Sequence, residues 1–215
     1  MRTISQIQPV FIDILLPRAE TKMQAMAKDI VLVLSFSLLT ALSAQVSFWM
    51  GPVPITGQTF AVLISGILLG SIRGAFSQVI YLLIGISGVP FWFAAGGVPG
   101  IARLIGPTGG YLIGFIFTAF IVGRLAEAGW SRTVKKAIIA MLVGNIVIYI
   151  FGLSWLVKFI PPERLLIVGI YPFIIGDLFK ILLAGSILPF GWRLIQKVRV
   201  DELHSSSPSL RSVNE

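Results

Sequence analysis

Long stretches without any charged residue dominate the hydrophobic pattern of this chain. Asp, Glu, Lys and Arg are absent from 30–72, 74–102, 104–123 and 137–157. A helix needs about 20 mostly apolar residues to cross a bilayer, so each stretch is long enough to hold a membrane-spanning helix. The pattern therefore predicts an all-α, polytopic membrane protein.

Glycine, proline and polar clusters divide this apolar pattern into six predicted helices. We expect spans at about 29–48, 57–69, 74–86, 108–125, 136–157 and 165–190, with a kink at Pro172 in the last. The second and third spans are short for helices that cross a bilayer at right angles. A short surface helix at 21–28 is expected to lead into the first span. We find no internal repeat that would indicate a two-fold transporter architecture.

The distribution of basic residues predicts the orientation. With six spans, thirteen of the 17 Lys and Arg residues fall on one side of the membrane and three on the other, and Lys180 lies within a span. Because basic residues concentrate on the cytoplasmic side, we expect both termini in the cytoplasm and the protein in the cytoplasmic (inner) membrane. The loops at 51–57, 87–107 and 158–164 then face outward.

Polar segments flank the predicted bundle. We divide the chain into an N-terminal cytoplasmic segment (1–27), a six-helix transmembrane domain (28–192) and a tail (193–215). The first 28 residues contain Pro9, Asp13 and Pro17 and lack a long apolar core, which argues against a cleaved signal peptide. The tail is basic and then serine-rich, so we expect it to be disordered.

The composition excludes several classes of function. The chain has no cysteine and a single histidine, His204, in the polar tail, so we expect no catalytic residues, no metal site and no cofactor. The net charge of +8 is attributed to loops that face anionic lipid rather than to nucleic acid.

The sixth span carries an acid and a base three residues apart, Asp177 and Lys180. Residues at i and i+3 share a helix face, and each charge costs about 2.5–3.5 kcal/mol at the centre of a membrane helix. Both side chains are therefore expected to face inward. Asn145 of the fifth span lies at nearly the same depth, which predicts a polar pocket open to the outside. A structural ion pair between helices is the alternative.

Two further patterns each have two interpretations. Small residues on the first span allow close helix packing, either within the bundle or against a partner; they include Ser37, Ala41 and Ala44. In the irregular, aromatic segment 87–107, Gly96 and Gly97 would let the backbone approach a ligand. The aromatic residues there would otherwise form a belt at the membrane interface.

Several of these segments together resemble the BioY family, the biotin-specific substrate-binding (S) components of energy-coupling factor (ECF) transporters. The segment 52–59 reads Pro-Val-Pro-Ile-Thr-Gly-Gln-Thr, and 106–111 reads Gly-Pro-Thr-Gly-Gly-Tyr. Gly144-Asn145 and the Asp177-x-x-Lys180 pattern complete the resemblance, which covers about 28–190. It implies six membrane helices of the ECF S-component type and a pocket near the outer face.

The resemblance also implies a ligand and partners. Asp177 and Lys180 would bind polar groups of biotin, and Arg103 would bind its carboxylate. The expected biotin-binding residues are Asp177, Lys180, Arg103, Asn145, Tyr111 and Gly97. A transmembrane coupling subunit would meet Ser37, Ala41 and Ala44. The chain has no phosphate-binding loop, so two separate ATPase subunits would hydrolyse ATP. A homo-oligomer remains open.

Other functions remain as alternatives. The chain would otherwise be an S component for another small vitamin or a solitary biotin transporter without ATPases. A membrane enzyme lacks support, because no nucleophile–base pair is evident. A structural membrane protein would use Asp177 and Lys180 only to pair helices. Biotin itself fits an acid, a donor and an arginine, since it offers ureido N–H groups, a ureido carbonyl and a carboxylate.

Overall fold

The computed structural model describes residues 8–17, 19–49 and 51–206, and nearly all of this part is helical. The helices are α1 (Phe11–Leu15), α2 (Lys22–Gln45), α3 (Gln58–Leu69), α4 (Ser71–Ile86), α5 (Ile101–Ile105), α6 (Gly109–Glu127), α7 (Val134–Leu156), α8 (Leu165–Gly169) and α9 (Tyr171–Ser206). Two short strands, β1 (Ser47–Phe48) and β2 (Ile55–Thr56), pair antiparallel, with Ser47 opposite Thr56. The predicted all-α class is confirmed.

The lengths of the helices fit a protein that crosses a membrane several times. α2, α6, α7 and the stretch Pro162–Trp192 are long and apolar enough to span, while α3 and α4 are shorter apolar helices. Each of the first five predicted spans thus overlaps one helix of the structure, and the sixth covers α8 and the first part of α9. The number of spans itself stays a prediction.

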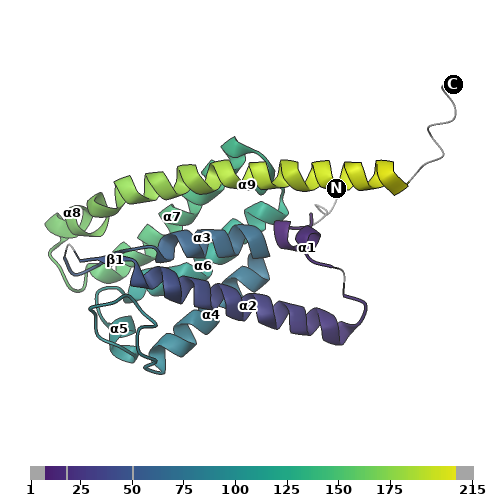
Figure 1. Ribbon diagram of the computed structural model, residues 1–215. Coiled ribbons are helices and arrows are strands. Elements are labelled where there is room, and N and C mark those ends of the chain that lie inside the picture. The colour runs from purple at the N-terminus through teal and green to yellow at the C-terminus, as the bar shows by residue number, and fades with distance from the viewer. Residues whose placement is uncertain (1–7, 18, 50, 207–215) are drawn as a thin grey trace, which may run out of the picture.

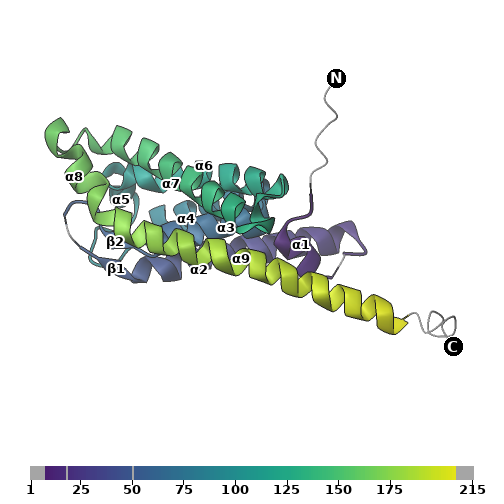
Figure 2. The same ribbon diagram turned by 90° about the horizontal axis from the view of Figure 1, so that it is seen from above.

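The helices form an elongated bundle with two different ends (Figures 1 and 2). α6 packs against α3, α4 and α7, α2 packs on α3 and α4, and α9 packs mainly on α7. The strands, α5 and α8 lie at one end, called the loop end below. α1 and the C-terminal part of α9 lie at the opposite end, called the α1 end. α3 approaches α6 so closely that a Cβ atom on Gly66 would lie 2.6 Å from the Ala119 carbonyl oxygen.

Helix α2, which corresponds to the first predicted span, begins earlier than the sequence predicts. α2 begins at Lys22, because Thr21 and Gln24 form a reciprocal capping box. The predicted surface helix at 21–28 is therefore the first part of α2. The helix ends at Gln45, before the predicted end at 48, since Ser47 and Phe48 pair with β2 instead.

The last helix also differs from its prediction. The interruption lies at Ile170 between α8 and α9, two residues before Pro172. Pro172 is the second residue of α9, where a missing backbone N–H costs no helical hydrogen bond, so the helix begins beside the proline instead of kinking at it. α9 continues to Ser206, so the expected disorder does not begin at 193. Leu, Gln, Lys and Arg in that stretch are good helix formers. The remaining tail, 207–215, and residues 1–7 lie outside the described residues, and the three-part division of the chain stays a prediction.

The small residues of the first span pack within the bundle. Ser37 and Ala44 are completely buried, and Ala41 is 4% exposed. On the same face, Gln78 of α4 donates its side-chain N–H to Thr40 Oγ1 at 3.2 Å. In this structure these residues thus face helices of the same chain, while the contact with a coupling subunit stays a prediction. Small side chains allow close approach, and here helices of the same chain make that approach.

Candidate functional site

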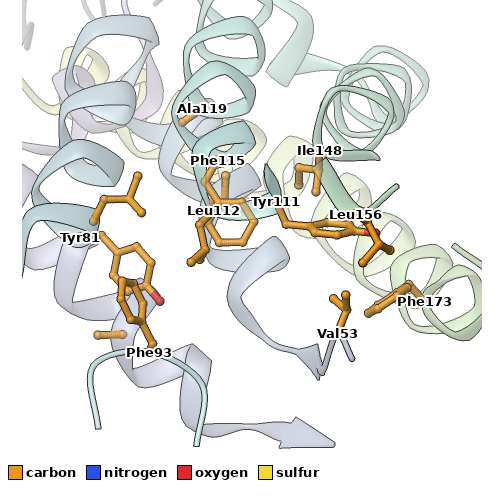
Figure 3. Packing of buried hydrophobic residues seen from close by; sticks show 13 residues of the cluster. Val53, Tyr81, Phe93, Tyr111, Leu112, Phe115, Ala119, Ile148, Leu156 and Phe173 are labelled. Atoms are coloured by element: carbon orange, nitrogen blue, oxygen red, sulfur yellow. The ribbon is translucent and has the colours of Figure 1, made fainter. Parts of the chain in front are cut away.

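A cavity lies at the loop end between the segment that follows β1 and helices α6, α7 and α9. Its lining combines apolar residues with a few polar ones: Val53, Pro54, Thr56, Gln58, Thr59, Ala94, Arg103, Thr108, Tyr111, Leu112, Phe115, Ile148, Tyr149, Phe173 and Asp177. In Figure 3, Val53 and Phe173 lie at one side of the surrounding cluster, Tyr81 and Phe93 at the other, with Tyr111 and Phe115 between them. Such a mixture suits a small organic ligand with a few polar groups.

The cavity is narrow in this structure. Its volume is about 40 Å³, whereas pockets that hold small ligands measure roughly 300–1,000 Å³. A ligand therefore fits only if some of the surrounding segments move apart.

Asp177 supplies the carboxylate of the cavity. It is 6% exposed, although its α9 neighbours Ile175 and Phe179 are 83% and 68% exposed. Its Oδ2 accepts a hydrogen bond from the Tyr149 hydroxyl, and its Oδ1 lies 3.4 Å from Lys180 Nζ. The predicted inward orientation of Asp177 and its pairing with Lys180 are thus present in the structure.

Lys180 lies beside the cavity rather than in its wall. Its ammonium donates to the Thr56 carbonyl at 2.9 Å and to Thr59 Oγ1 at 2.8 Å, in addition to Asp177. Three acceptors thus face its three N–H groups. Lys180 consequently fastens α9 to the segment that opens α3.

Arg103 supplies the cation of the cavity. Its residue in α5 is 5% exposed, its Nη2 donates to the Ala94 carbonyl at 2.8 Å, and its guanidinium lies 5.1 Å from the centre of the Trp49 ring. Burial lowers the pKa of the Arg103 guanidinium from its usual value, but arginine keeps its proton in proteins. Within the described part of the chain, no carboxylate forms a salt bridge with it. A buried cation of this kind favours an anionic ligand group.

The other predicted ligand residues have different positions. Tyr111 lines the cavity, and its hydroxyl donates to the Gly169 carbonyl at 2.9 Å, next to the interruption between α8 and α9. Gly97 does not line the cavity; a side chain there would collide with the guanidinium of Arg103. The absence of a side chain at Gly97 thus makes room for the Arg103 guanidinium, whereas the sequence predicted that it would let the backbone approach a ligand. Asn145 is 5% exposed and lies outside the lining as well.

Sequence reasoning missed several residues of the site. Tyr149 follows Asn145 by four positions on the same face of α7, a spacing that could have indicated it. Gln58 donates its side-chain N–H to the Tyr81 hydroxyl and accepts from Thr56 Oγ1 at 2.8 Å. Thr56, Gln58 and Thr59 belong to the segment 52–59 that the sequence singled out, but only as a resemblance.

The chain has clear relatives. The model of the BioY family matches residues 18–197. A probable biotin transporter BioY of Pyrococcus horikoshii is 41% identical over 154 residues, covering 72% of this chain and 90% of the relative. The biotin transporter BioY of Thermotoga maritima is 38% identical over 153 residues, covering 71% and 88%. That of Rhizobium etli is 35% identical over 169 residues, covering 74% and 89%.

A solved structure has the same fold. It is a crystal structure of the S-component for biotin from an ECF-type ABC transporter. The two chains superpose with a TM-score of 0.68 at 29% sequence identity, and the match covers 80% of this chain and 93% of that one.

Proposed function

The chain belongs to the BioY family, and we propose that it binds biotin at the loop-end cavity as the substrate-specific component of an ECF transporter. The protein takes part in biotin uptake as a membrane-embedded component, as its relatives do, and is not an enzyme. One observation carries the site: a buried carboxylate and a buried guanidinium share a cavity whose remaining wall is largely apolar.

The groups of the cavity match those of biotin. Asp177 would accept hydrogen bonds from the ureido N–H groups, and Arg103 would bind the carboxylate through a bidentate pair. Val53, Phe115 and Phe173 would contact the apolar ring and tail. Lys180 would act beside Asp177, within reach of the ureido carbonyl once its present partners yield.

Coupling to ATP hydrolysis requires other proteins. The sequence contains no phosphate-binding loop, so we assign ATP hydrolysis to two separate ATPase subunits and their contact with this chain to a transmembrane coupling subunit. With Ser37, Ala41 and Ala44 buried, the exposed apolar faces of α2 and α9 are left for lipid and for this subunit.

We also propose that the α1 end faces the cytoplasm and that the cavity opens outward across the inner membrane. The excess of basic residues at that end of the predicted topology supports this orientation. α1 and the C-terminal part of α9 lie at the same end of the bundle, in agreement with termini on one side (Figure 1). The chain has no cysteine of its own, so a Val98→Cys variant should react with an impermeant thiol reagent on intact cells, and Lys135→Cys should not.

Binding of tritiated biotin by the purified protein in detergent tests the function. We expect saturable binding at nanomolar concentration, with unlabelled biotin as competitor and with thiamine and riboflavin as non-competing controls. Failure to bind biotin, or displacement of bound biotin by another vitamin at equal concentration, would contradict the assignment of the substrate.

A further inference from the structure

The N-terminal segment 8–15, which includes α1, lies outside the part of the chain that matches the family, 18–197. It is nevertheless attached to the bundle at the α1 end. We call residues 8–15 the N-terminal clasp.

The clasp joins several helices through polar contacts. Asp13 Oδ1 lies 2.6 Å from Arg73 Nη1 at the start of α4, and Arg73 Nε lies 2.8 Å from Asp29 Oδ1 of α2. The backbone N–H of Gln8 donates to the backbone carbonyl of Glu127, at the end of α6, at 3.0 Å. The clasp thus contacts α4 and α6 directly and α2 through Arg73.

Apolar contacts connect the clasp to α9. The rings of Phe11 and Trp192 meet edge to face, with centroids 5.6 Å apart at 85°. Gly191 has no side chain and thereby leaves room for Phe11, whose ring carbons lie 3.0 Å from where a Cβ would stand. Val10 is 3% exposed and belongs to the core cluster that contains Ile67 and Leu188. The clasp therefore connects α9 to the opposite side of the bundle.

The packing around the polar contacts of the clasp is partly open. A groove of about 400 Å³ lies beside Gln8, Val10 and Glu127, and another of about 470 Å³ lies beside Ile14 and Lys28. Both grooves border Pro9, Asp13 and Arg73. Segments with few buried contacts open more readily than a close-packed core. We therefore expect the clasp to open at a lower free-energy cost than the core of the bundle.

Helix α9 connects the clasp to the cavity. Asp177 lies in the cavity wall, and Trp192, the partner of Phe11, follows it by fifteen residues, about 22 Å along the helix. α9 packs mainly on α7, and the guanidinium of Arg132 lies 4.9 Å from the centre of the Trp192 ring, so Phe11 of the clasp is one of several contacts that restrain the C-terminal half of α9. The narrow cavity admits a ligand only if its walls move, and one of these walls is α9.

We propose that the clasp and the biotin site oppose each other through α9. The closed clasp holds α9 where the cavity is narrow, and biotin moves α9 and thereby loosens Phe11 from Trp192. This coupling rests on the function proposed above. Because coupling between two equilibria is reciprocal, opening the clasp strengthens biotin binding by the factor with which biotin favours the open clasp.

The first test opens the clasp by mutation. Asp13→Asn removes the ion pair to Arg73, which keeps Asp29 as a partner, so no charge is stranded. We expect the dissociation constant for biotin to fall by about fivefold or more, the lower range of typical coupling. Leu15→Ala is the matched control, since Leu15 lies on α1 but is 55% exposed. It should bind biotin as the wild type does.

The second test observes the clasp directly. Val10→Cys introduces the sole cysteine of the chain at a position that is buried while the clasp is closed. Saturating biotin should raise its rate of maleimide labelling severalfold, while Leu15→Cys should label at the same rate with and without biotin.

The outcomes separate the two proposals. If wild-type protein binds biotin but neither the affinity of Asp13→Asn nor the labelling of Val10→Cys changes, the coupling is wrong and the function stands. If the wild type does not bind biotin, the function and the coupling are both wrong.

Discussion

At the α1 end of the bundle, Arg73 faces two carboxylates, whereas at the loop end Arg103 is buried with the Ala94 carbonyl as its hydrogen-bond partner. The carboxylate groups differ in a similar way. Glu127 accepts from the Ser71 amide at 2.7 Å and from its hydroxyl at 2.8 Å, so it caps the start of α4. Asp177 instead lies in the wall of a cavity.

The polar groups at the α1 end stabilise the fold, whereas those at the loop end are available to bind a ligand. A buried charge without an opposite charge destabilises a protein by roughly several kcal/mol. At the α1 end the chain itself provides that opposite charge. At the loop end the Arg103 cation forms no salt bridge with a carboxylate of the described residues, and such exceptions occur mainly at functional sites.

The largest effect on biotin binding is expected when Arg103 is replaced by methionine, and the same replacement at Arg73 gives the comparison. Arg103→Met should weaken biotin binding by about 30-fold to 3,000-fold, because losing one member of a buried charge pair typically costs 2–5 kcal/mol. Arg73→Met should lower thermal stability without weakening biotin binding, since it strands Asp13 and Asp29. Equilibrium binding and thermal melting of both variants measure the contrast.

A ligand control sharpens the assignment of Arg103. Biotin amide lacks the negative charge, so Arg103→Met should bind biotin and biotin amide equally well, whereas the wild type should prefer biotin. Equal preference in the two proteins would show that Arg103 does not contact the carboxylate.

The next largest effect concerns Asp177 and Lys180. Asp177→Asn and Lys180→Met should each weaken binding by about 10-fold to 150-fold, the range expected for hydrogen bonds to charged groups. The double variant removes both charges, so its melting temperature should lie above that of at least one single variant. Its biotin binding should stay weak. A stable double variant with wild-type affinity would show that the two residues form a structural ion pair and do not bind biotin.

A smaller effect is expected at Thr59. Thr59→Val removes one of the three acceptors of Lys180 and keeps the size of the side chain. The loss of one hydrogen bond of about 1 kcal/mol should lower the free energy of unfolding by about that amount. Because Lys180 leaves this acceptor to reach the ureido carbonyl, the affinity for biotin should not fall. Thr59→Ser retains the hydroxyl and should restore most of the stability. If the valine variant binds biotin more weakly and the serine variant does not, Lys180 keeps its contact with Thr59 in the bound state.

The smallest effect on the ligand is expected at the start of α2. Thr21→Ala breaks the capping box with Gln24 and should lower the free energy of unfolding by about 1 kcal/mol. Thr21 is far from the cavity in the chain and contributes nothing to its lining, so the affinity for biotin should stay unchanged. Thermal melting followed by a binding assay on the same sample checks both parts.

The positions of the apolar helices could be predicted because apolar stretches end at strong breakers. The expected span 57–69 is α3 (Gln58–Leu69), and the span 108–125 is α6 (Gly109–Glu127). Asp177 and Lys180 were predictable too, since two charges three residues apart on a membrane helix have few stable orientations.

Other features depend on tertiary contacts that no local pattern contains. The small residues around Ala41 predict a close helix contact, but not whether the second helix belongs to the same chain. A glycine is required at position 97 because the guanidinium of Arg103 packs against it. The sequence does not contain this contact, because it depends on how the loop folds. Tyr149 was missed because one aromatic residue within an apolar span looks like any other until its hydroxyl finds Asp177.

The short length of α4 has a consequence for the surrounding bilayer. Its 16 residues rise about 24 Å, whereas the 24 residues of α2 rise about 36 Å and a typical hydrocarbon core is about 30 Å thick. Ile72, Phe76 and Leu83 of α4 are more than half exposed, so this short helix offers an apolar surface to lipid. If α4 spans the membrane as predicted, lipid tails beside it would have to shorten or tilt to match it, while those beside α2 would not. We therefore predict an asymmetric thinning of the membrane around the protein, and lipids with shorter acyl chains should stabilise it in reconstituted vesicles.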